Sequence, residues 1–210
     1  MFITFEGIDA SGKSTHVKHL EKYFLDRGEK VIVVREPGGT KVSEAIRKIL
    51  LSKQNLEMVR ECEIFLFCAS RTQLVQELIL PKLKEGYIVI SDRFHDSTTA
   101  YQGAGRAISP GDINTLHKIA IDGCLPDLTF FIDIEYDEAL NRQMANQKSH
   151  DRIESTGIEF FDRVREGYIA ISEREPQRVH VIDGYRSVEK IHNEIVQIVE
   201  RKMRNGIKKQ

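Results

Sequence analysis

Eight consecutive residues near the amino terminus have the types and spacing to bind phosphate. They read Gly7-Ile8-Asp9-Ala10-Ser11-Gly12-Lys13-Ser14 and match the pattern G-x-x-x-x-G-K-[ST]. The two glycines allow backbone torsions closed to other residues, so successive N–H groups can approach an anion. Lys13 supplies a point charge for the β- and γ-phosphates, and the Ser14 hydroxyl suits Mg²⁺. We expect this phosphate-binding loop (P-loop), with Thr15 after it, to bind a nucleoside triphosphate and Mg²⁺.

A second oxygen ligand for magnesium is expected at the end of another strand. An apolar run over residues 87–91 leads to Asp92, and Arg93 follows at once. A carboxylate that only caps a helix has the same appearance in a sequence, but beside a P-loop the metal-binding interpretation is favoured. Ser14 and Asp92 are therefore the predicted magnesium ligands.

Short apolar runs alternate with longer amphipathic runs along the chain. This alternation predicts βαβ units, and strands that are apolar throughout are typical of a parallel sheet covered on both faces. We predict one α/β domain over residues 1–210, with five parallel strands and helices on both faces. The predicted strands are Phe2–Glu6, Lys30–Arg35, Tyr87–Ser91, Leu128–Ile134 and Arg178–Ile182, and the main helices are Lys13–Asp26, Lys41–Leu51, Leu56–Lys84 and Ser187–Met203.

Composition excludes several classes of partner. The 210 residues include 31 Lys and Arg against 32 Asp and Glu, so the net charge of −1 gives no bulk attraction to nucleic acid or to an anionic membrane. No apolar run approaches the ~20 residues that span a bilayer. The cysteines, Cys62, Cys68 and Cys124, form no Cys-x-x-Cys pair, which argues against a zinc site or a disulfide framework. We expect reduced thiols, the first two in a helix core, and a cytoplasmic protein without nucleic-acid or membrane partners.

Three kinds of P-loop enzyme can be compared with the chain. A GTPase needs a guanine-reading Asn-Lys-x-Asp, but residues 146–149 read Asn-Gln-Lys-Ser. An ATP-driven transport module would carry a signature such as Leu-Ser-Gly-Gly-Gln, which is absent. A small-molecule kinase needs an acceptor pocket and several arginines for two phosphate groups, and this chain has both. A nucleotide-binding regulatory module, which would bind ATP without turning over an acceptor, stays open at this point.

Two segments have the residues for the walls of an acceptor pocket. The helix predicted over Leu56–Lys84 places Phe67 and Arg71 on one stripe with Leu74 and Leu78. A charged residue in an apolar stripe is costly unless it is matched, so Arg71 is either a base-reading donor or half of a buried ion pair. The second wall, residues 94–103, would place Thr98, Tyr101 and Gln102 on one helical face, where the amide of Gln102 could match the polar edge of a pyrimidine.

Six segments of the chain stand out together: Phe5-Glu6-Gly7, Arg35-Glu36-Pro37-Gly38-Gly39-Thr40, Phe67-Cys68-Ala69-Ser70-Arg71, Asp92-Arg93, Ala100-Tyr101-Gln102-Gly103 and Pro126-Asp127-Leu128-Thr129. Together they resemble the bacterial thymidylate kinases over about residues 2 to 185. The resemblance implies a three-layer P-loop NTPase fold with strand order 2-3-1-4-5 and a small lid segment. It also implies transfer of the ATP γ-phosphate to dTMP, giving dTDP and ADP in the synthesis of dTTP, and usually a homodimer.

The same resemblance assigns roles at the acceptor. Asp9 would meet the 3′-hydroxyl side of the acceptor sugar or act through magnesium, with Glu36 close to it. Arg47 and Arg93 would hold the acceptor phosphate. Asp9, Lys13 and Arg93 are thus the predicted catalytic residues around the P-loop.

Five further residues would bind the thymidine part. By the resemblance, Phe67 would stack on thymine while Arg71, Thr98 and Gln102 read its polar edge. Tyr101 would crowd the sugar 2′ position and favour deoxyribose. The chain departs from the family in carrying Thr98 where Ser is common, a change that keeps the hydroxyl.

The lid is expected at about residues 142–157. No free position of the P-loop is basic, so the charge on the transferring phosphoryl group must be met from elsewhere. Arg142, Lys148 and Arg152 are candidates, which resembles the lid-arginine type of thymidylate kinase. A planar guanidinium can span two phosphate oxygens, which favours Arg142 and Arg152 as catalytic residues. The alternatives are an ordinary solvated loop, and pairing of both arginines with acids such as Asp151 or Glu154.

Overall fold

The computed structural model describes residues 1–145 and 151–207 and contains a five-stranded parallel sheet. The strands are β1 (Phe2–Glu6), β2 (Val31–Arg35), β3 (Ile88–Asp92), β4 (Leu128–Asp133) and β5 (Val179–Asp183). Their order is β2-β3-β1-β4-β5, which confirms the predicted order. In the registers on either side of β1, Phe2 lies opposite Val89 and Ile3 opposite Leu128. The central strand is completely buried because helices cover both of its faces.

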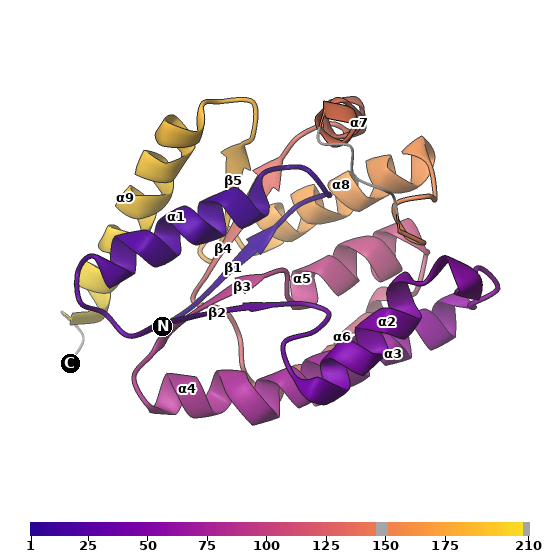
Figure 1. Cartoon of the computed structure of the whole chain (residues 1–210), viewed down its shortest axis with the longest axis horizontal. Coiled ribbons are helices and arrows are strands. Elements are labelled where there is room, and N and C mark those ends of the chain that lie inside the picture. The colour runs from indigo at the N-terminus through magenta and orange to yellow at the C-terminus, as the bar shows by residue number, and fades with distance from the viewer. Residues whose placement is uncertain (146–150, 208–210) are drawn as a thin grey trace.

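Helices form a layer on each face of the sheet (Figure 1). On one face α1 (Lys13–Leu25) packs beside α9 (Val188–Ile207), and their buried side chains meet those of the central strands. Leu20 and Phe24 of α1 and Ile195 and Val199 of α9 are completely shielded from solvent in this cluster. The helices of the other layer are α3 (Arg60–Leu74), α4 (Leu80–Lys84), α5 (His95–Thr98), α6 (Pro110–Ile121) and α8 (Ile158–Arg174), with α2 (Lys41–Leu51) packed on α3 and α7 (Tyr136–Ala145) near α8.

The long helix predicted over Leu56–Lys84 differs from the observed one in two ways. It begins at Arg60, because a short 3₁₀ turn over Lys53–Asn55 is followed by a turn in which Asn55 accepts from the Met58 N–H. It is also interrupted by a π-helical turn over Val75–Ile79. The extra residue of that turn advances the buried stripe by one position, so Ile79 is completely buried and Leu78 only partly.

The edge strands are less covered than their apolar sequences predict. Val33 of β2 is 40% exposed and Val181 of β5 is 48% exposed, since each strand has a neighbour on one side alone. The expectation that Cys62 lies in a helix core is wrong, because its side chain is exposed on α3, whereas Cys68 is buried. No helix among the described residues is long and apolar enough to cross a membrane.

Candidate active site

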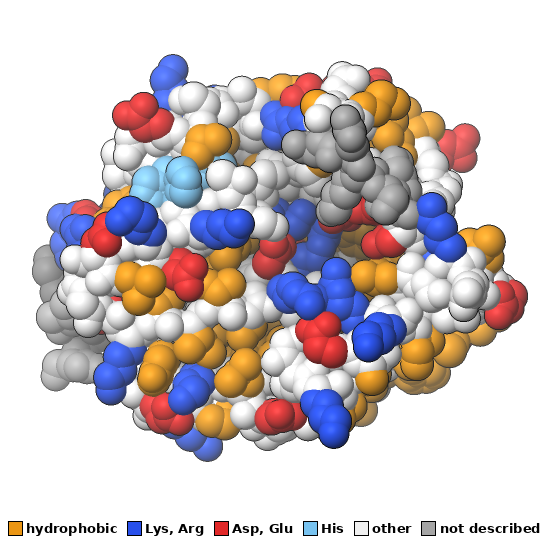
Figure 2. Space-filling model, in the orientation of Figure 1, with side chains coloured by type: hydrophobic (Ala, Val, Ile, Leu, Met, Phe, Trp, Pro, Cys, Tyr) orange, Lys and Arg blue, Asp and Glu red, His pale blue; other side chains and the backbone are white. Residues whose placement is uncertain are grey.

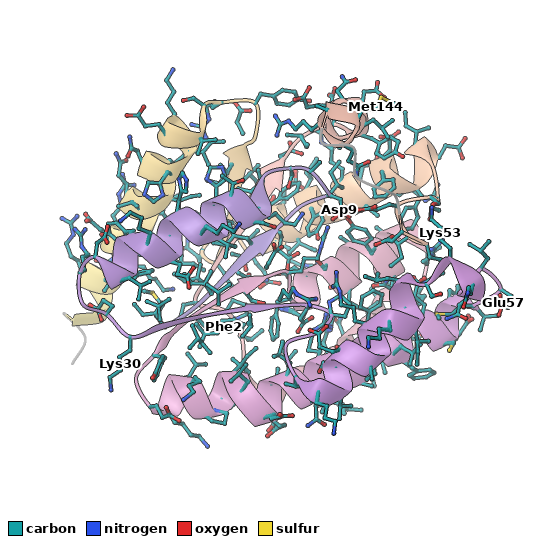
Figure 3. All side chains as sticks on the ribbon, viewed as in Figure 1. Phe2, Asp9, Lys30, Lys53, Glu57 and Met144 are labelled. Atoms are coloured by element: carbon teal, nitrogen blue, oxygen red, sulfur yellow. The ribbon has the colours of Figure 1, made fainter. Side chains whose placement is uncertain are left out.

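The P-loop joins β1 to α1 at the carboxyl end of the sheet, where Figure 3 labels Asp9. Gly7 has a φ of 134°, and a Cβ there would lie 2.5 Å from the Ile132 carbonyl oxygen, so only glycine fits. Gly12, at φ 102°, is the N-cap of α1. The loop therefore turns its backbone toward the first turn of the helix, whose free N–H groups attract an anion.

Lys13, the first residue of α1, is already drawn into the P-loop. Its Nζ donates a hydrogen bond to the Ile8 carbonyl oxygen at 2.8 Å, and 5% of the residue is exposed. Burial, together with the charge of Arg93, lowers the pKa of Lys13 to about 8 against the opposing effect of Asp9. A bound triphosphate supplies the anion that this buried ammonium lacks.

The two predicted magnesium ligands lie together. Ser14 Oγ donates a hydrogen bond to Asp92 Oδ2 at 2.6 Å, although 78 residues separate them in the chain. A hydroxyl and one carboxylate form an all-oxygen donor set that fits Mg²⁺, which takes its remaining ligands from water and phosphate. The described residues contain no cluster of three or more His, Cys, Asp or Glu suited to a metal, so a dedicated protein cage is absent from them.

A cavity of about 710 Å³ opens over the P-loop. The residues that line it include Arg142 on α7, Gly184 and Arg186 between β5 and α9, and Val188 at the start of α9. Figure 2 shows lysine and arginine side chains gathered around a hollow on this face. Its size and its positive charge suit a nucleoside triphosphate.

A second, smaller cavity of about 90 Å³ lies beside the first. Four residues line both cavities, namely Asp9, Glu36, Arg47 and Arg93. The predicted base-binding residues Phe67, Thr98, Tyr101 and Gln102 line the smaller one, together with Pro37, Leu51, Ser97, Asp151 and Ile153. The structure thus brings these predicted acceptor residues together at the border of the P-loop cavity, whereas Arg71, also predicted to read the base, lines neither cavity.

Arg93 is held where the two cavities meet. Its Nη1 donates to the Gly7 carbonyl oxygen at 2.8 Å, and its Nη2 lies 3.1 Å from Asp9 Oδ1. Nη2 also donates to the Tyr101 hydroxyl at 3.2 Å. Arg47 approaches from α2, where its Nη1 donates to the Pro37 carbonyl oxygen at 2.8 Å. Two guanidinium groups from different elements therefore face the shared wall.

Arg71 forms the buried ion pair that was one of its two interpretations. Its Nη2 lies 2.6 Å from Glu36 Oε2, and both side chains are almost completely buried. The pair leaves hydrogen-bonding groups unused, because Arg71 Nη1 and Glu36 Oε1 are buried without a hydrogen-bond partner among the described residues. Thr98 Oγ1 is also buried without such a partner among them. Burial raises the pKa of Glu36, and the charge of Arg71 opposes that rise. Unpaired buried polar atoms are costly, so these three atoms are suited to hydrogen-bond a polar ligand.

The lid arginines lie in different surroundings. Arg142 pairs with Glu138 at 2.6 Å, donates to the Gly184 carbonyl oxygen and lines the P-loop cavity. Arg152 is buried, pairs with Glu63 at 2.6 Å and lines neither cavity. Both arginines thus pair with acids, as the alternative interpretation expects, here with Glu138 and Glu63. Lys148 lies outside the described residues.

Sequence reasoning missed two buried carboxylates that support the site. Glu63, on the first turn of α3, accepts from Gln102, Arg106 and Arg152. Glu6 accepts from the Phe94 N–H at 2.7 Å and from the Ser97 hydroxyl, which fixes the turn that follows Arg93. Each is a single acid within an amphipathic or apolar run, and that pattern does not reveal which donors it meets.

Comparison with known proteins decides the family. The family model described as thymidylate kinase matches residues 5–195. This chain belongs to the thymidylate kinase family. It is 47% identical over 196 residues to the thymidylate kinase of Kosmotoga olearia, with 93% of each chain covered, and 43% identical to that of Chlorobaculum parvum, with 95% of each covered. The crystal structure of thymidylate kinase from Ehrlichia chaffeensis superposes with a TM-score of 0.77 at 36% identity, covering 95% of this chain and 98% of that one.

Membership of the thymidylate kinase family settles the class of reaction. The protein is an ATP-dependent dTMP kinase that forms dTDP on the route to dTTP, as the resemblance implied. The GTPase, the transport module and the non-enzymatic regulatory module are excluded as interpretations of its P-loop. ATP is its co-substrate and dTMP its acceptor.

Proposed function

We propose that ATP binds in the P-loop cavity, dTMP binds in the smaller cavity, and the phosphates meet at Asp9, Glu36, Arg47 and Arg93. The observation that carries this assignment is that these four residues line both cavities. In-line transfer needs the attacking oxygen and the γ-phosphate on one line, and two adjoining cavities with a shared charged wall provide it.

The protein needs no strong general base for this transfer. The nucleophile is an oxygen of the dTMP phosphate, which is ionised near neutral pH, so catalysis consists mainly of positioning and charge neutralisation. Arg47 and Arg93 orient the acceptor phosphate, and Lys13 with the P-loop backbone holds the donor phosphates. Arg142 is the better placed of the two lid arginines to meet the transferring group, because it lines the P-loop cavity. Asp9 fixes Arg93 through their ion pair.

Ser14 and Asp92 would hold Mg²⁺, which would supply positive charge to neutralise the phosphates. The support is the short contact between these two oxygen donors beside the P-loop.

We further propose a single domain over residues 1–210 with its lid at about 142–157, a homodimer, and a cytoplasmic location.

The base is read by groups left unpaired in the structure. Thr98 Oγ1 and Arg71 Nη1 are buried without hydrogen-bond partners among the described residues. Thr98 and Phe67 line the small cavity, and Arg71 pairs with Glu36, which lines it too. Phe67 stacks on thymine, Arg71, Thr98 and Gln102 meet its polar edge, and Tyr101 crowds the sugar 2′ position.

A coupled ADP-release assay with ATP and a panel of nucleoside monophosphates tests the assignment. Wild-type protein should turn over dTMP in preference to dCMP, dGMP and dAMP. Gln102→Ala should lose that preference while its affinity for ATP is unchanged, because Gln102 lines only the smaller cavity. An unchanged ranking of acceptors in Gln102→Ala would place the base pocket elsewhere.

A further inference from the structure

Glu63 is a buried carboxylate surrounded by donors. Its side chain is 1% exposed on α3, directly behind the small cavity wall formed by Gln102. Gln102 Nε2 donates to Glu63 Oε1 at 2.9 Å, and Arg152 Nη2 donates to Glu63 Oε2 at 2.6 Å. Arg106 adds two longer hydrogen bonds of 3.3 and 3.4 Å. None of these contacts is used by the phosphoryl transfer itself.

The charge of Glu63 fixes which way the Gln102 amide points. Burial alone raises the pKa of Glu63, but the hydrogen bond from Gln102 and the charges of Arg106 and Arg152 outweigh it, so its pKa lies below the ordinary value. An ionised carboxylate only accepts hydrogen bonds, so Gln102 must present its NH₂ group to it. The amide oxygen, Oε1, then points the other way and receives no hydrogen bond from the described residues.

We propose that Glu63 is a positioning residue that turns the Gln102 amide oxygen toward the base and thereby selects a pyrimidine with an N3–H donor. Thymine and uracil carry a proton on N3, whereas cytosine has an acceptor there. Gln102 Oε1 therefore pairs with the first two and meets a lone pair of the third. This inference rests on the proposed placement of dTMP in the small cavity.

Arg152 connects this selection to the lid. It belongs to the segment after residues 146–150, and besides Glu63 it binds the Leu50 carbonyl oxygen at 2.8 Å. Its neighbours Asp151 and Ile153 line the small cavity. The ion pair between Arg152 and Glu63 thus places residues 151–153 against the base pocket. The positive charge of Arg152 also keeps Glu63 ionised.

The test is the acceptor selectivity of Glu63→Gln. A glutamine at this position can donate as well as accept, so the Gln102 amide is no longer held in one orientation. The ratio of kcat/KM for dTMP to that for dCMP should fall by at least about tenfold, mainly through KM for dTMP. The ratio for dTMP to dUMP should stay within about twofold, since both bases carry N3–H. A merely structural role for Glu63 would weaken all three acceptors and leave both ratios unchanged, which would overturn the proposal.

Glu61→Gln is the matched control. Glu61 lies in the same first turn of α3, but its side chain is 58% exposed and pairs with Arg60. The variant removes the same charge and should leave both selectivity ratios at their wild-type values. An equal fall of the dCMP ratio in Glu61→Gln would show a general charge effect and would overturn the proposal.

A double-mutant cycle separates this inference from the assignment of the pocket. Gln102→Met removes both polar groups, and adding Glu63→Gln to it should change selectivity no further. If Gln102→Met loses the dTMP preference and Glu63→Gln keeps it, the role of Glu63 is wrong and the pocket stands. If both keep it, the placement of dTMP is wrong. Should Glu63→Gln fail to fold, Glu63→Asp retains the charge while withdrawing it from Gln102, and the same fall in the dCMP ratio is expected.

Discussion

Burial makes the positive charge of Lys13 less favourable than that of an exposed lysine. With a pKa of about 8 in the free protein, it is mostly protonated at pH 7 and mostly neutral at pH 9. Binding an anionic triphosphate favours the protonated form of Lys13. Above pH 8, binding is therefore accompanied by uptake of a proton at this side chain. The affinity for ATP should therefore weaken as the pH rises through 8, by up to about tenfold per pH unit.

Calorimetric titration of ATP between pH 7 and 9.5 measures this effect. Lys13→Met should bind ATP more weakly at pH 7 and show little further loss toward pH 9.5, because the titrating group is gone. Its turnover should fall below about a tenth of the wild-type rate. A wild-type affinity that is flat across pH 8 would contradict the buried position of Lys13.

Glu6 makes the stability of the fold depend on pH. Burial, together with the charge of Asp96, raises its pKa from 4.5 to about 7 against the hydrogen bond from Ser97. Between these values the folded protein keeps a proton that the unfolded chain releases, so the stabilisation is complete below pH 4.5 and is lost as the pH rises through 7. The free energy of unfolding from Glu6 should thus decrease between pH 4.5 and 7.

Urea unfolding of wild type and Glu6→Gln at several pH values isolates that contribution. The difference between the two proteins should vary with pH in this window, and Glu29→Gln, which changes an exposed acid, should follow the wild-type curve. A constant difference between wild type and Glu6→Gln would show that Glu6 is ionised throughout.

At the scale of elements, the two described arginines of the proposed lid lie in different surroundings. Arg142 faces the P-loop cavity from α7, whereas Arg152 is buried on Glu63. Arg142→Ala should lower kcat by at least about tenfold, since it removes a cation from the transferring group. Arg152→Ala should raise KM for dTMP and leave kcat within about threefold. Steady-state kinetics with each substrate varied in turn distinguishes them, and equal losses of kcat would assign both arginines to the phosphates.

The sequence is sufficient for the order of elements but not for their side-chain partners. The P-loop, the strand order and most residues that line the smaller cavity were predictable, because glycine spacing, apolar runs and family motifs are local signals. Arg71 shows the limit, since its stripe on α3 allowed an ion pair or a base contact and the structure pairs it with Glu36, 35 residues away. The π-helical turn at Val75–Ile79 was also unpredictable, because it depends on packing against the sheet rather than on residue type.

For the whole molecule, two ligands that bind separate parts of one fold should stabilise it separately. ATP at 100 times its Kd should add about 2.7 kcal/mol to the free energy of unfolding. For a chain of this size that is a rise in Tm of about 5–10 °C. Calorimetric scans should show the ATP shift lost in Lys13→Ala and the dTMP shift retained, and loss of both shifts would mean that the two cavities do not bind independently.

Both strands that pair with the central strand β1 come from distant parts of the chain. Phe2 lies opposite Val89, and Ile3 lies opposite Leu128 on the other side. During synthesis β1 therefore leaves the ribosome long before either partner strand exists, and pairing over such separations is slow. Gly7 packs on the carbonyl of Ile132 in β4. A nascent chain that ends before β4 therefore contains the whole phosphate-binding motif but lacks a contact that shapes the P-loop. Nucleotide binding should thus begin, in a series of truncated chains, only once the chain extends past β4.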